Sequence, residues 1–402
     1  MSAGGLSRAR LARMHEVMAG YVARGEVPGL VTLVSRRGEV QVDVIGTKAA
    51  GGNDPMRRDT IFRITSMTKP ITAAAAMILV EECKLRLDEP VDRLLPELAD
   101  RKVLKRLDGP LDETVPARRP ITVRDLLTFR MGFGTITQPS SDYPIQKAVN
   151  ERQLMMGPPK PRTPHGPDEW MRRFGTLPLL HQPGEQWMYN TGSHVLGVLI
   201  ARAAGQPLET FLRERLFEPL GMKDTGFTVP AAKLDRLATS YWASAETGAL
   251  ELHDGVQDSQ WSRPPAFPDA GAGLVSTIDD YLAFGQMMLD QGKHGSLRIL
   301  SRPSVEAMTT DQLTPGQKAA SGFFPGFWDS RGWGFGLEVI TRRDDLASVP
   351  GRFGWAGGYG TTWASDPREQ MVAILMTQRA AFPPSSWVYL DFWSSAYAAI
   401  DD

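Results

Sequence analysis

Ser66 and Lys69 are the residues of this 402-residue chain that point most directly to chemistry, because they form its only Ser-x-x-Lys sequence. Ser66 opens an apolar run typical of a buried helix, and a residue three positions later projects from the same helix face. A serine hydroxyl becomes a good nucleophile when a neighbouring base removes its proton. A lysine withdrawn from water holds its proton less tightly and can be that base. The pair predicts a nucleophilic serine; the alternative is a helix-capping serine followed by a surface lysine.

Tyr189 is a second candidate, in the segment 184–191 that follows a Pro-Gly turn and leads into a helical pattern. A tyrosine near a lysine cation ionises more readily than in water, so it could move a proton between the nucleophile and a leaving group. The alternative is a core tyrosine whose hydroxyl has an ordinary hydrogen-bond partner.

A third candidate segment, Gly354-Trp355-Ala356-Gly357-Gly358-Tyr359-Gly360, lies between strand patterns. Glycines in a strand let its backbone approach a ligand closely. A backbone N–H of this strand could share a developing oxyanion with the N–H of Ser66. The alternative is a glycine-rich bulge or turn.

Positions 66, 189 and 355 need elements that bring them together. The periodicity predicts an N-terminal amphipathic helix, a hairpin over 31–44, a short strand at 60–64, a buried helix over 66–82 and further helices over 122–128 and 194–204. Strands are predicted at 334–340, 361–365 and 371–377. This order indicates an α/β domain formed by residues 1–100 and 250–402, a mostly helical domain over 101–249, and an active site between them.

The three motifs, in this order, resemble those of the serine β-lactamase and penicillin-binding-protein superfamily: Ser-x-x-Lys, then a Tyr motif, then a Lys/His/Trp-x-Gly strand. The likeness is greatest to the family VIII carboxylesterases, because their third motif also begins with tryptophan. The resemblance covers most of the chain and extends to IFRI (61–64), LRLDEPV (85–91), ITVRDLLT (121–128), LGMKDTGF (220–227) and AGLVST (272–277).

The resemblance implies a β-lactamase/transpeptidase-like α/β fold, with an antiparallel sheet flanked by helices and an inserted helical domain. It implies a carboxylesterase acting on small, neutral acyl esters through an acyl-enzyme, without a metal or organic cofactor. Ser66 would attack the carbonyl with Lys69 and Tyr189 as the general base. The N–H groups of Ser66 and Gly358 would hold the oxyanion, and substrate would contact Thr191, Trp355, Ala356 and Gly357.

Two departures from the family pattern bear on the substrate, and a third has no evident consequence. Thr191 replaces a frequent asparagine that contacts a substrate amide in β-lactamases, and Trp355 replaces a cation that attracts a substrate carboxylate. An apolar indole favours a neutral acyl or alcohol group. The segment 129–132 differs from the usual His-x-Ser-Gly, and the sequence gives no physical reason.

Net charge, apolar runs and cysteine content indicate which partners and which cellular location to expect. A net charge of −1, without a clustered basic face, gives no reason to expect a nucleic-acid or membrane partner. The longest apolar run is too short for a transmembrane helix, and no secretion signal is apparent, so a cytoplasmic location is expected. The single cysteine, Cys83, is expected to be buried and inert. The oligomeric state is not predicted.

Other activities remain as alternatives on the same fold: a β-lactamase or D-alanyl-D-alanine peptidase, an acyltransferase, a hydrolase of short amide oligomers, or a binding protein without catalysis. The sequence has no Gly-x-Ser-x-Gly and no His-Glu-x-x-His, which argues against an α/β-hydrolase and a zinc hydrolase. His194 is interpreted as a surface or core histidine and Glu185 as a turn residue. The proline-dense segment 139–167 is the candidate rim of the substrate pocket.

Overall fold

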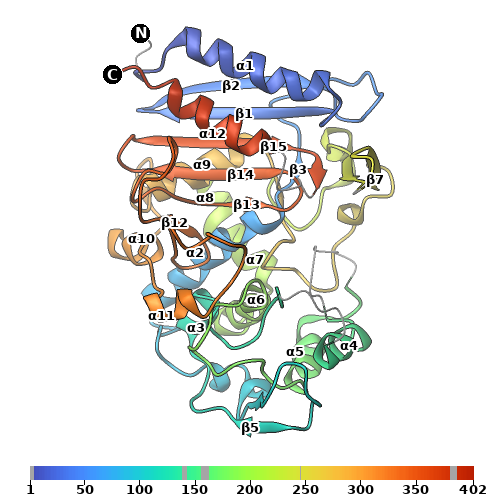
Figure 1. Ribbon diagram of the computed structural model, residues 1–402, viewed down its shortest axis with the longest axis vertical. Helices are drawn as coiled ribbons and strands as arrows, with labels where there is room; N and C mark the ends of the chain where they lie inside the picture. The colour runs from blue at the N-terminus through green and yellow to red at the C-terminus, as the bar shows by residue number, and fades with distance from the viewer. Residues whose placement is uncertain (1–3, 138–142, 155–162, 245, 381–386) are drawn as a thin grey trace.

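The computed structural model describes residues 4–137, 143–154, 163–244, 246–380 and 387–402. Its largest sheet has seven antiparallel strands in the order β11-β12-β13-β14-β15-β1-β2 (Figure 1). Two strands come from the N-terminal part of the chain and five from the C-terminal part, which confirms the predicted antiparallel sheet. The strands are β1 (Gly29–Arg36), β2 (Glu39–Gly46), β11 (Arg331–Trp333), β12 (Glu338–Ile340), β13 (Phe353–Gly357), β14 (Thr361–Asp366) and β15 (Met371–Thr377).

Both faces of this sheet are covered, which explains why every residue of β1 is buried. Successive side chains of a strand point to opposite faces. Leu30 and Val34 pack in the cluster with α1 (Arg8–Ala23) and α12 (Val388–Ala398), whereas Val31 and Leu33 belong to the main core, with α9 (Ile278–Leu289). In Figure 1, α1 and α12 lie together at the end of the molecule that carries both termini.

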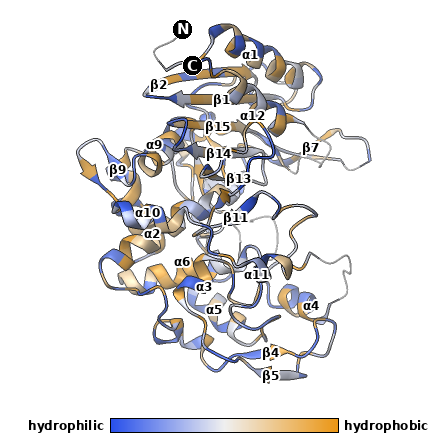
Figure 2. Cartoon of the chain, turned by 60° about the vertical axis from the view of Figure 1, so that its left-hand side comes forward, coloured by the Kyte–Doolittle hydropathy of each residue, from blue (hydrophilic) through white to orange (hydrophobic). Residues whose placement is uncertain are grey.

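The other half of the molecule is mostly helical, and its centre is the packing of α2 (Thr68–Glu81) against α6 (Thr191–Ala204). Both helices are apolar on most sides, as the orange of α6 in Figure 2 shows, so burial rather than intrinsic helix propensity stabilises them. The further helices are α3 (Val123–Leu127), α4 (Pro144–Glu151), α5 (Pro167–Gly175), α7 (Leu208–Leu212), α8 (Glu218–Leu220), α10 (Arg302–Met308) and α11 (Pro315–Ala319).

A short two-stranded sheet is important for the site. It pairs β3 (Phe62–Arg63) with β8 (Val275–Ser276), and so brings the residues before Ser66 beside those that follow the turn 269–273. The remaining short strands are β4 (Lys102–Leu104), β5 (Thr114–Pro116), β6 (Ser240–Ala243), β7 (Leu250–Asp254), β9 (Lys293–His294), β10 (Leu297–Arg298) and β16 (Arg379–Ala380).

Two predictions from the sequence are wrong in detail. The strand predicted at 334–340 begins only at Glu338, because residues 334–337 form a turn in which Gly336 has a φ of +70°. Cys83 is exposed rather than buried, because it lies beyond the end of α2 with a φ of +57°. Much of the proposed rim, residues 138–142 and 155–162, lies outside the described residues.

Among the helices that the structure describes, none is by itself long and apolar enough to cross a membrane. Thr191–Ala204 and Leu208–Leu220, which are bent by 79° relative to each other, are together long and apolar enough by length and composition alone.

Candidate active site

Ser66 lies in a short 3₁₀ turn, Thr65–Met67, between β3 and α2. The preceding residue, Thr65, has a φ of +41°, a conformation that costs a β-branched residue free energy. Its side chain is buried and its Oγ1 has no hydrogen-bond partner among the described residues. This strained turn places Ser66 at the head of the buried helix, in the wall of a cavity.

Lys69 follows on the first turn of α2, with its side chain only 1% exposed. Its Nζ lies 2.9 Å from Ser66 Oγ and donates a 2.7 Å hydrogen bond to the carbonyl oxygen of Gly271. Burial lowers the pKa of Lys69 to about 7, although the nearby carboxylate of Asp269 acts in the opposite direction. The amine is therefore in a state to accept a proton near neutral pH, and the serine hydroxyl is within its reach.

Tyr189 completes the group from the segment before α6. Its hydroxyl hydrogen-bonds Ser66 and accepts a 2.8 Å hydrogen bond from the indole Nε1 of Trp355. The Lys69 Nζ lies 4.6 Å from the centre of its ring. Burial raises the pKa of Tyr189, more than those two hydrogen bonds lower it. The sequence suggested a readily ionised tyrosine, but this environment keeps the phenol protonated, which suits a proton donor.

An aromatic cluster holds the Tyr189 ring. Phe129 meets it edge to face with ring centres 5.7 Å apart, and Trp187 and Trp333 pack beside both. Phe129 is buried and has a φ of +56°, so the backbone turns sharply there. The family departure at 129–132, for which the sequence gave no reason, thus supplies a wall that orients the tyrosine.

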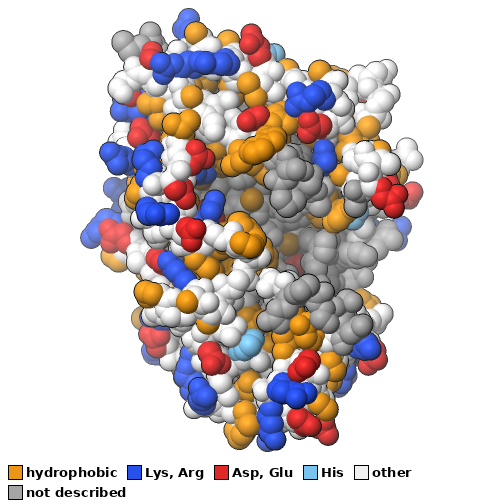
Figure 3. Space-filling view, viewed as in Figure 1, with side chains coloured by type: hydrophobic (Ala, Val, Ile, Leu, Met, Phe, Trp, Pro, Cys, Tyr) orange, Lys and Arg blue, Asp and Glu red, His pale blue; other side chains and the backbone are white. Residues whose placement is uncertain are grey.

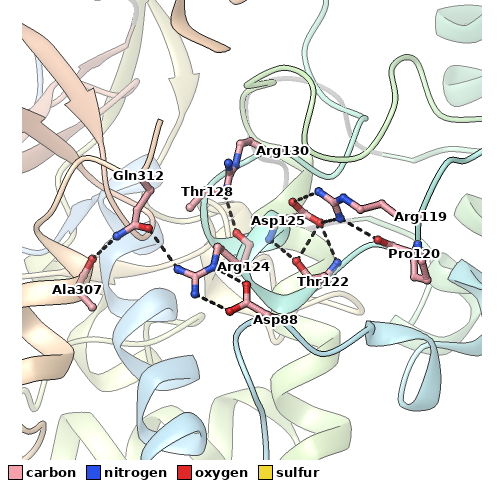
Figure 4. Close-up of polar contacts among 10 residues, drawn as sticks. All are labelled: Asp88, Arg119, Pro120, Thr122, Arg124, Asp125, Thr128, Arg130, Ala307 and Gln312. Carbon is pink, nitrogen blue, oxygen red and sulfur yellow. Dashed lines mark hydrogen bonds and ion pairs between the residues drawn. The ribbon is translucent and has the colours of Figure 1, made fainter. Parts of the chain in front are cut away.

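Polar contacts around α3 fix the start of that wall (Figure 4). Asp125 forms a capping box with Thr122 at the helix start and accepts hydrogen bonds of 2.5 and 2.9 Å from Arg119. Arg124 pairs with Asp88 at 2.7 and 2.8 Å and reaches Gln312 (Figure 4). Because these contacts tie α3 to three other segments, the residues that follow it are held in place.

Strand β13 lies next to the turn that carries Ser66, and the residues of β13 nearest to this turn are small. A Cβ on Gly357 would lie 2.3 Å from the carbonyl oxygen of Ile64 and 2.6 Å from Thr65 Oγ1, so only glycine lets the strand approach the nucleophile turn this closely. Ala356 and Gly358 are exposed and line the same cavity as Ser66. The structure thus brings Ser66, Tyr189, Trp355, Ala356, Gly357 and Gly358 to one cavity. Thr191 begins α6, is buried, and does not appear in that lining.

The cavity has a volume of about 590 Å³ and runs from Ser66 along β13 toward α12. Its walls carry aromatic side chains from distant segments: Tyr189, Phe323, Phe324, Phe327, Trp355, Tyr389 and Trp393. The face shown in Figure 3 is hollowed near its middle, with hydrophobic side chains at the border. Within the described residues, no group of three or more His, Cys, Asp or Glu side chains is arranged to hold a metal ion.

The sequence reasoning missed Asp269 and Gly271. Gly271 supplies the carbonyl that Lys69 contacts, and Asp269 accepts hydrogen bonds from the backbone N–H groups of Gly271 and Ala272, at 2.7 and 3.1 Å. His194 Nε2 lies 3.2 Å from the same carboxylate oxygen, so this histidine is a buried partner of an acid. An acid followed by Ala-Gly-Ala-Gly, before a strand, was the signal available for a tight turn.

An antiparallel sheet flanked by helices, with a serine, a lysine and a tyrosine meeting at a buried helix start, defines the serine β-lactamase-like class of proteins. The chain belongs to the beta-lactamase family, whose profile matches residues 14–387. This confirms the family predicted from the motifs.

Three similar proteins illustrate the relationship. An uncharacterized protein of Mycobacterium tuberculosis is 42% identical over 362 residues, which cover 88% of this chain and 86% of that protein. Esterase EstB of Burkholderia gladioli is 30% identical over 396 residues, with coverage of 92% and 90%. The solved structure of EstCE1, described as a hydrolase with promiscuous acyltransferase activity, has a TM-score of 0.80 at 24% identity, with coverage of 97% and 99%. The esterase relative supports a serine hydrolase activity, and EstCE1 shows that the chain has the same fold.

Proposed function

We propose that the protein is a serine carboxylesterase that hydrolyses small, neutral acyl esters through an acyl-enzyme on Ser66. The observation that carries this proposal is the 2.9 Å contact between Ser66 Oγ and the fully buried amine of Lys69, whose pKa burial lowers to about 7. A base whose pKa lies near the working pH is present largely in its unprotonated form and still binds a proton strongly enough to take it from the serine. The esterase relative on the same fold supports the same reaction.

In acylation, the Ser66 Oγ–H proton passes to the Lys69 amine as the Oγ–carbon bond forms. The carbonyl oxygen then carries a negative charge, which the N–H groups of Ser66 and Gly358 hold in this proposal. When the ester C–O bond breaks, Tyr189 donates its phenol proton to the leaving alcohol and recovers a proton from the Lys69 ammonium. A water then attacks the acyl-enzyme, and Lys69 returns the water's proton to Ser66 as the acid leaves.

Preference for a neutral substrate rests on the aromatic part of the cavity wall, since the charged side chains in the lining are of both signs: Arg331 and Arg352, Glu338 and Asp345. Trp355 presents an indole where β-lactamase relatives carry a cation, and its N–H is already engaged with Tyr189. The neighbouring aromatic side chains offer apolar contact to an acyl or alcohol group. No cofactor takes part in the proposed steps.

Acyl transfer to an alcohol is the second candidate, because EstCE1 is described with both hydrolase and acyltransferase activity. The chemistry differs only in whether water or an alcohol attacks the acyl-enzyme. A cavity with an extended apolar wall can hold an alcohol acceptor in the place of water.

One assay separates the candidates. The purified protein is offered p-nitrophenyl acetate, butyrate and longer esters, and a chromogenic cephalosporin, each with and without an added primary alcohol. Ester turnover that is lost in Ser66→Ala supports the proposal. Faster turnover of the cephalosporin would move the protein to the β-lactamases, product esters formed in preference to acid would make it an acyltransferase, and no turnover by a folded protein would indicate a binding protein.

The pH dependence of kcat/KM follows from Lys69. Because the pKa of this amine lies at about 7, the amine is protonated and unable to act as a base below that pH. We expect kcat/KM for p-nitrophenyl butyrate to rise about tenfold per pH unit on the acidic side and to level above pH ~8. Initial rates between pH 5 and 9.5, corrected for spontaneous hydrolysis, measure this. A profile that stays flat down to pH 5 would contradict a lysine base.

Tyr189→Phe removes one oxygen from the site while keeping the ring in its aromatic cluster. We expect kcat to fall at least ~10²-fold, the lower range for loss of general acid–base catalysis, with a melting temperature close to that of the parent. Steady-state kinetics and a thermal melt measure both. Tyr21→Phe is the matched control, because this tyrosine lies on α1, its hydroxyl donates to Asp391, and it is not part of the cavity lining. A Tyr189→Phe enzyme with the parent's kcat would remove the phenol from the mechanism.

A further inference from the structure

Two buried titratable side chains close to Lys69 have no part in the steps above. Asp269 and His194 are each only 2% exposed, and His194 Nε2 lies 3.2 Å from Asp269 Oδ1. The second carboxylate oxygen, Oδ2, and the second ring nitrogen, Nδ1, have no hydrogen-bond partner among the described residues. Burying a carboxylate and an imidazole with one polar atom of each left without a partner is costly in free energy, so the pair is a candidate for a functional role.

The first consequence of the pair is positional. Asp269 closes the turn 269–273 by accepting the N–H groups of Gly271 and Ala272 with its side chain and that of Gly273 with its backbone carbonyl, at 2.8 Å. The turn is attached to α2 because Thr72 Oγ1 donates to the carbonyl of Ala270 at 2.7 Å. The Gly271 carbonyl therefore points at Lys69 Nζ.

That carbonyl restricts how the amine is oriented. A neutral lysine amine has two N–H donors and one lone pair. One N–H is used by the Gly271 oxygen at 2.7 Å, so that one of the two positions left on the nitrogen, the lone pair, can accept from the Ser66 hydroxyl at 2.9 Å. Without the carbonyl, no N–H is fixed and the amine can rotate about its Cε–Nζ bond.

His194 lies on α6, the helix that begins just after Tyr189, and its ring packs against the turn 269–273. A Cβ on Gly271 would lie 3.0 Å from two atoms of the His194 ring and 3.2 Å from the Asn190 side-chain oxygen, so the ring packs directly on the turn. Trp170 and Phe267 meet the imidazole edge to face. The histidine is thus enclosed by apolar rings on one side and by Asp269 on the other.

The second consequence is electrostatic. The titratable groups that the structure describes around Lys69 and its acceptor are Tyr189 and His194, from α6 and the segment before it, and Asp269 from the turn. Burial lowers the pKa of Lys69, and Asp269 is the charge that opposes this effect. Burial raises the pKa of Asp269, but His194, the Gly271 N–H and Lys69 together lower it further, so its net pKa is lowered and the carboxylate stays ionised.

We propose that Asp269 and His194 are a positioning pair, which fixes the Gly271 carbonyl beneath Lys69 and places one negative charge beside the amine. The inference rests on the proposed role of Lys69 as the base. It predicts that charge and position can be altered separately, the charge by Asp269→Asn and the position by Gly271→Ala.

Asp269→Asn tests the charge. The amide oxygen can still accept the Gly271 and Ala272 N–H groups, but the negative charge is gone, so the ammonium form of Lys69 loses an attraction. We expect the acidic limb of the kcat/KM profile to move to lower pH by about 1–2 units, which is the effect of a unit charge about 6–12 Å away at an effective dielectric constant of about 20. The plateau above pH 8 should stay within about tenfold of the parent. Asp258→Asn, at an exposed position, is the matched control.

Gly271→Ala tests the position and keeps the charge. The added methyl group would lie 3.0 Å from the His194 ring and 3.2 Å from the Asn190 side-chain oxygen, so the turn and these side chains must move apart by a few tenths of an ångström. We expect the plateau to fall at least about tenfold because the amine is misaligned, with the acidic limb unmoved. Gly255→Ala is the control, because a Cβ there meets nothing within 4 Å. Thermal melts establish that each variant is folded.

The results separate this inference from the proposed function. If the parent shows no Ser66-dependent turnover, the proposed function fails first. If the parent turns over esters with an acidic limb, but a folded Asp269→Asn leaves the limb in place, the charge role of the pair is overturned. A folded Gly271→Ala with the parent's plateau would overturn the positioning role. The second test stands even if Asp269→Asn does not fold.

Discussion

Ser66→Ala is expected to lower kcat/KM for p-nitrophenyl butyrate by at least ~10³-fold, because it removes the atom that would form the acyl-enzyme. The change deletes one partly buried oxygen at a strained turn, where Thr65 has a φ of +41°. The melting temperature is therefore expected to stay the same or rise, since strain is retained at functional sites at the expense of stability. Steady-state rates and a thermal melt measure the two effects.

Ser296→Ala is the matched control for this variant, because Ser296 is exposed in the loop between β9 and β10. It should keep the parent's rate. If Ser66→Ala keeps more than about a tenth of the parent's kcat/KM while Ser296→Ala behaves normally, the nucleophile is a different residue.

Lys69→Met is the second change with a large expected effect. Methionine fills a similar volume without an amine, so Ser66 loses the base that lies 2.9 Å from its hydroxyl. We expect kcat to fall at least ~10²-fold at every pH from 6 to 9, and the residual rate to lose the rise through pH 7 that the parent shows. Pre-steady-state acylation rates and the full pH profile measure this.

The control for Lys69→Met is Lys84→Met, at an exposed lysine just beyond the end of α2. That variant should leave the profile unchanged. A Lys69→Met enzyme that retains the parent's rise through pH 7 would show that another group titrates there, and the assignment of the base would have to change.

The sequence was sufficient for the features that rest on local chemistry. Ser66 and Lys69 are three residues apart, so helix geometry alone puts them on one face. The hairpin of β1 and β2 and the strand β15 follow from alternation and from an apolar run. The family motifs then placed Tyr189 and β13 beside them, although positions 66, 189 and 355 are far apart in the chain.

The sequence was not sufficient where the effect depends on tertiary surroundings. Tyr189 looked ionisable beside a lysine, but only the folded structure shows that burial outweighs the hydrogen bonds from Ser66 and Trp355 and keeps its proton on. Trp355 was expected only to contact substrate, yet its N–H also orients the tyrosine. Asp269 has no motif of its own, and its role becomes visible only when β3 and β8 pair and bring the turn 269–273 to Lys69.

Covalent capture of the acyl-enzyme tests the central claim most directly. The protein is mixed with excess p-nitrophenyl butyrate, quenched in acid within milliseconds, and examined by intact-mass and peptide mass spectrometry. We expect one butyryl group per chain, on the peptide that contains Ser66, and none in Ser66→Ala. A butyryl group on any other residue, or rapid turnover of the ester with no adduct at any quench time while a fluorophosphonate also fails to label Ser66, would contradict the account.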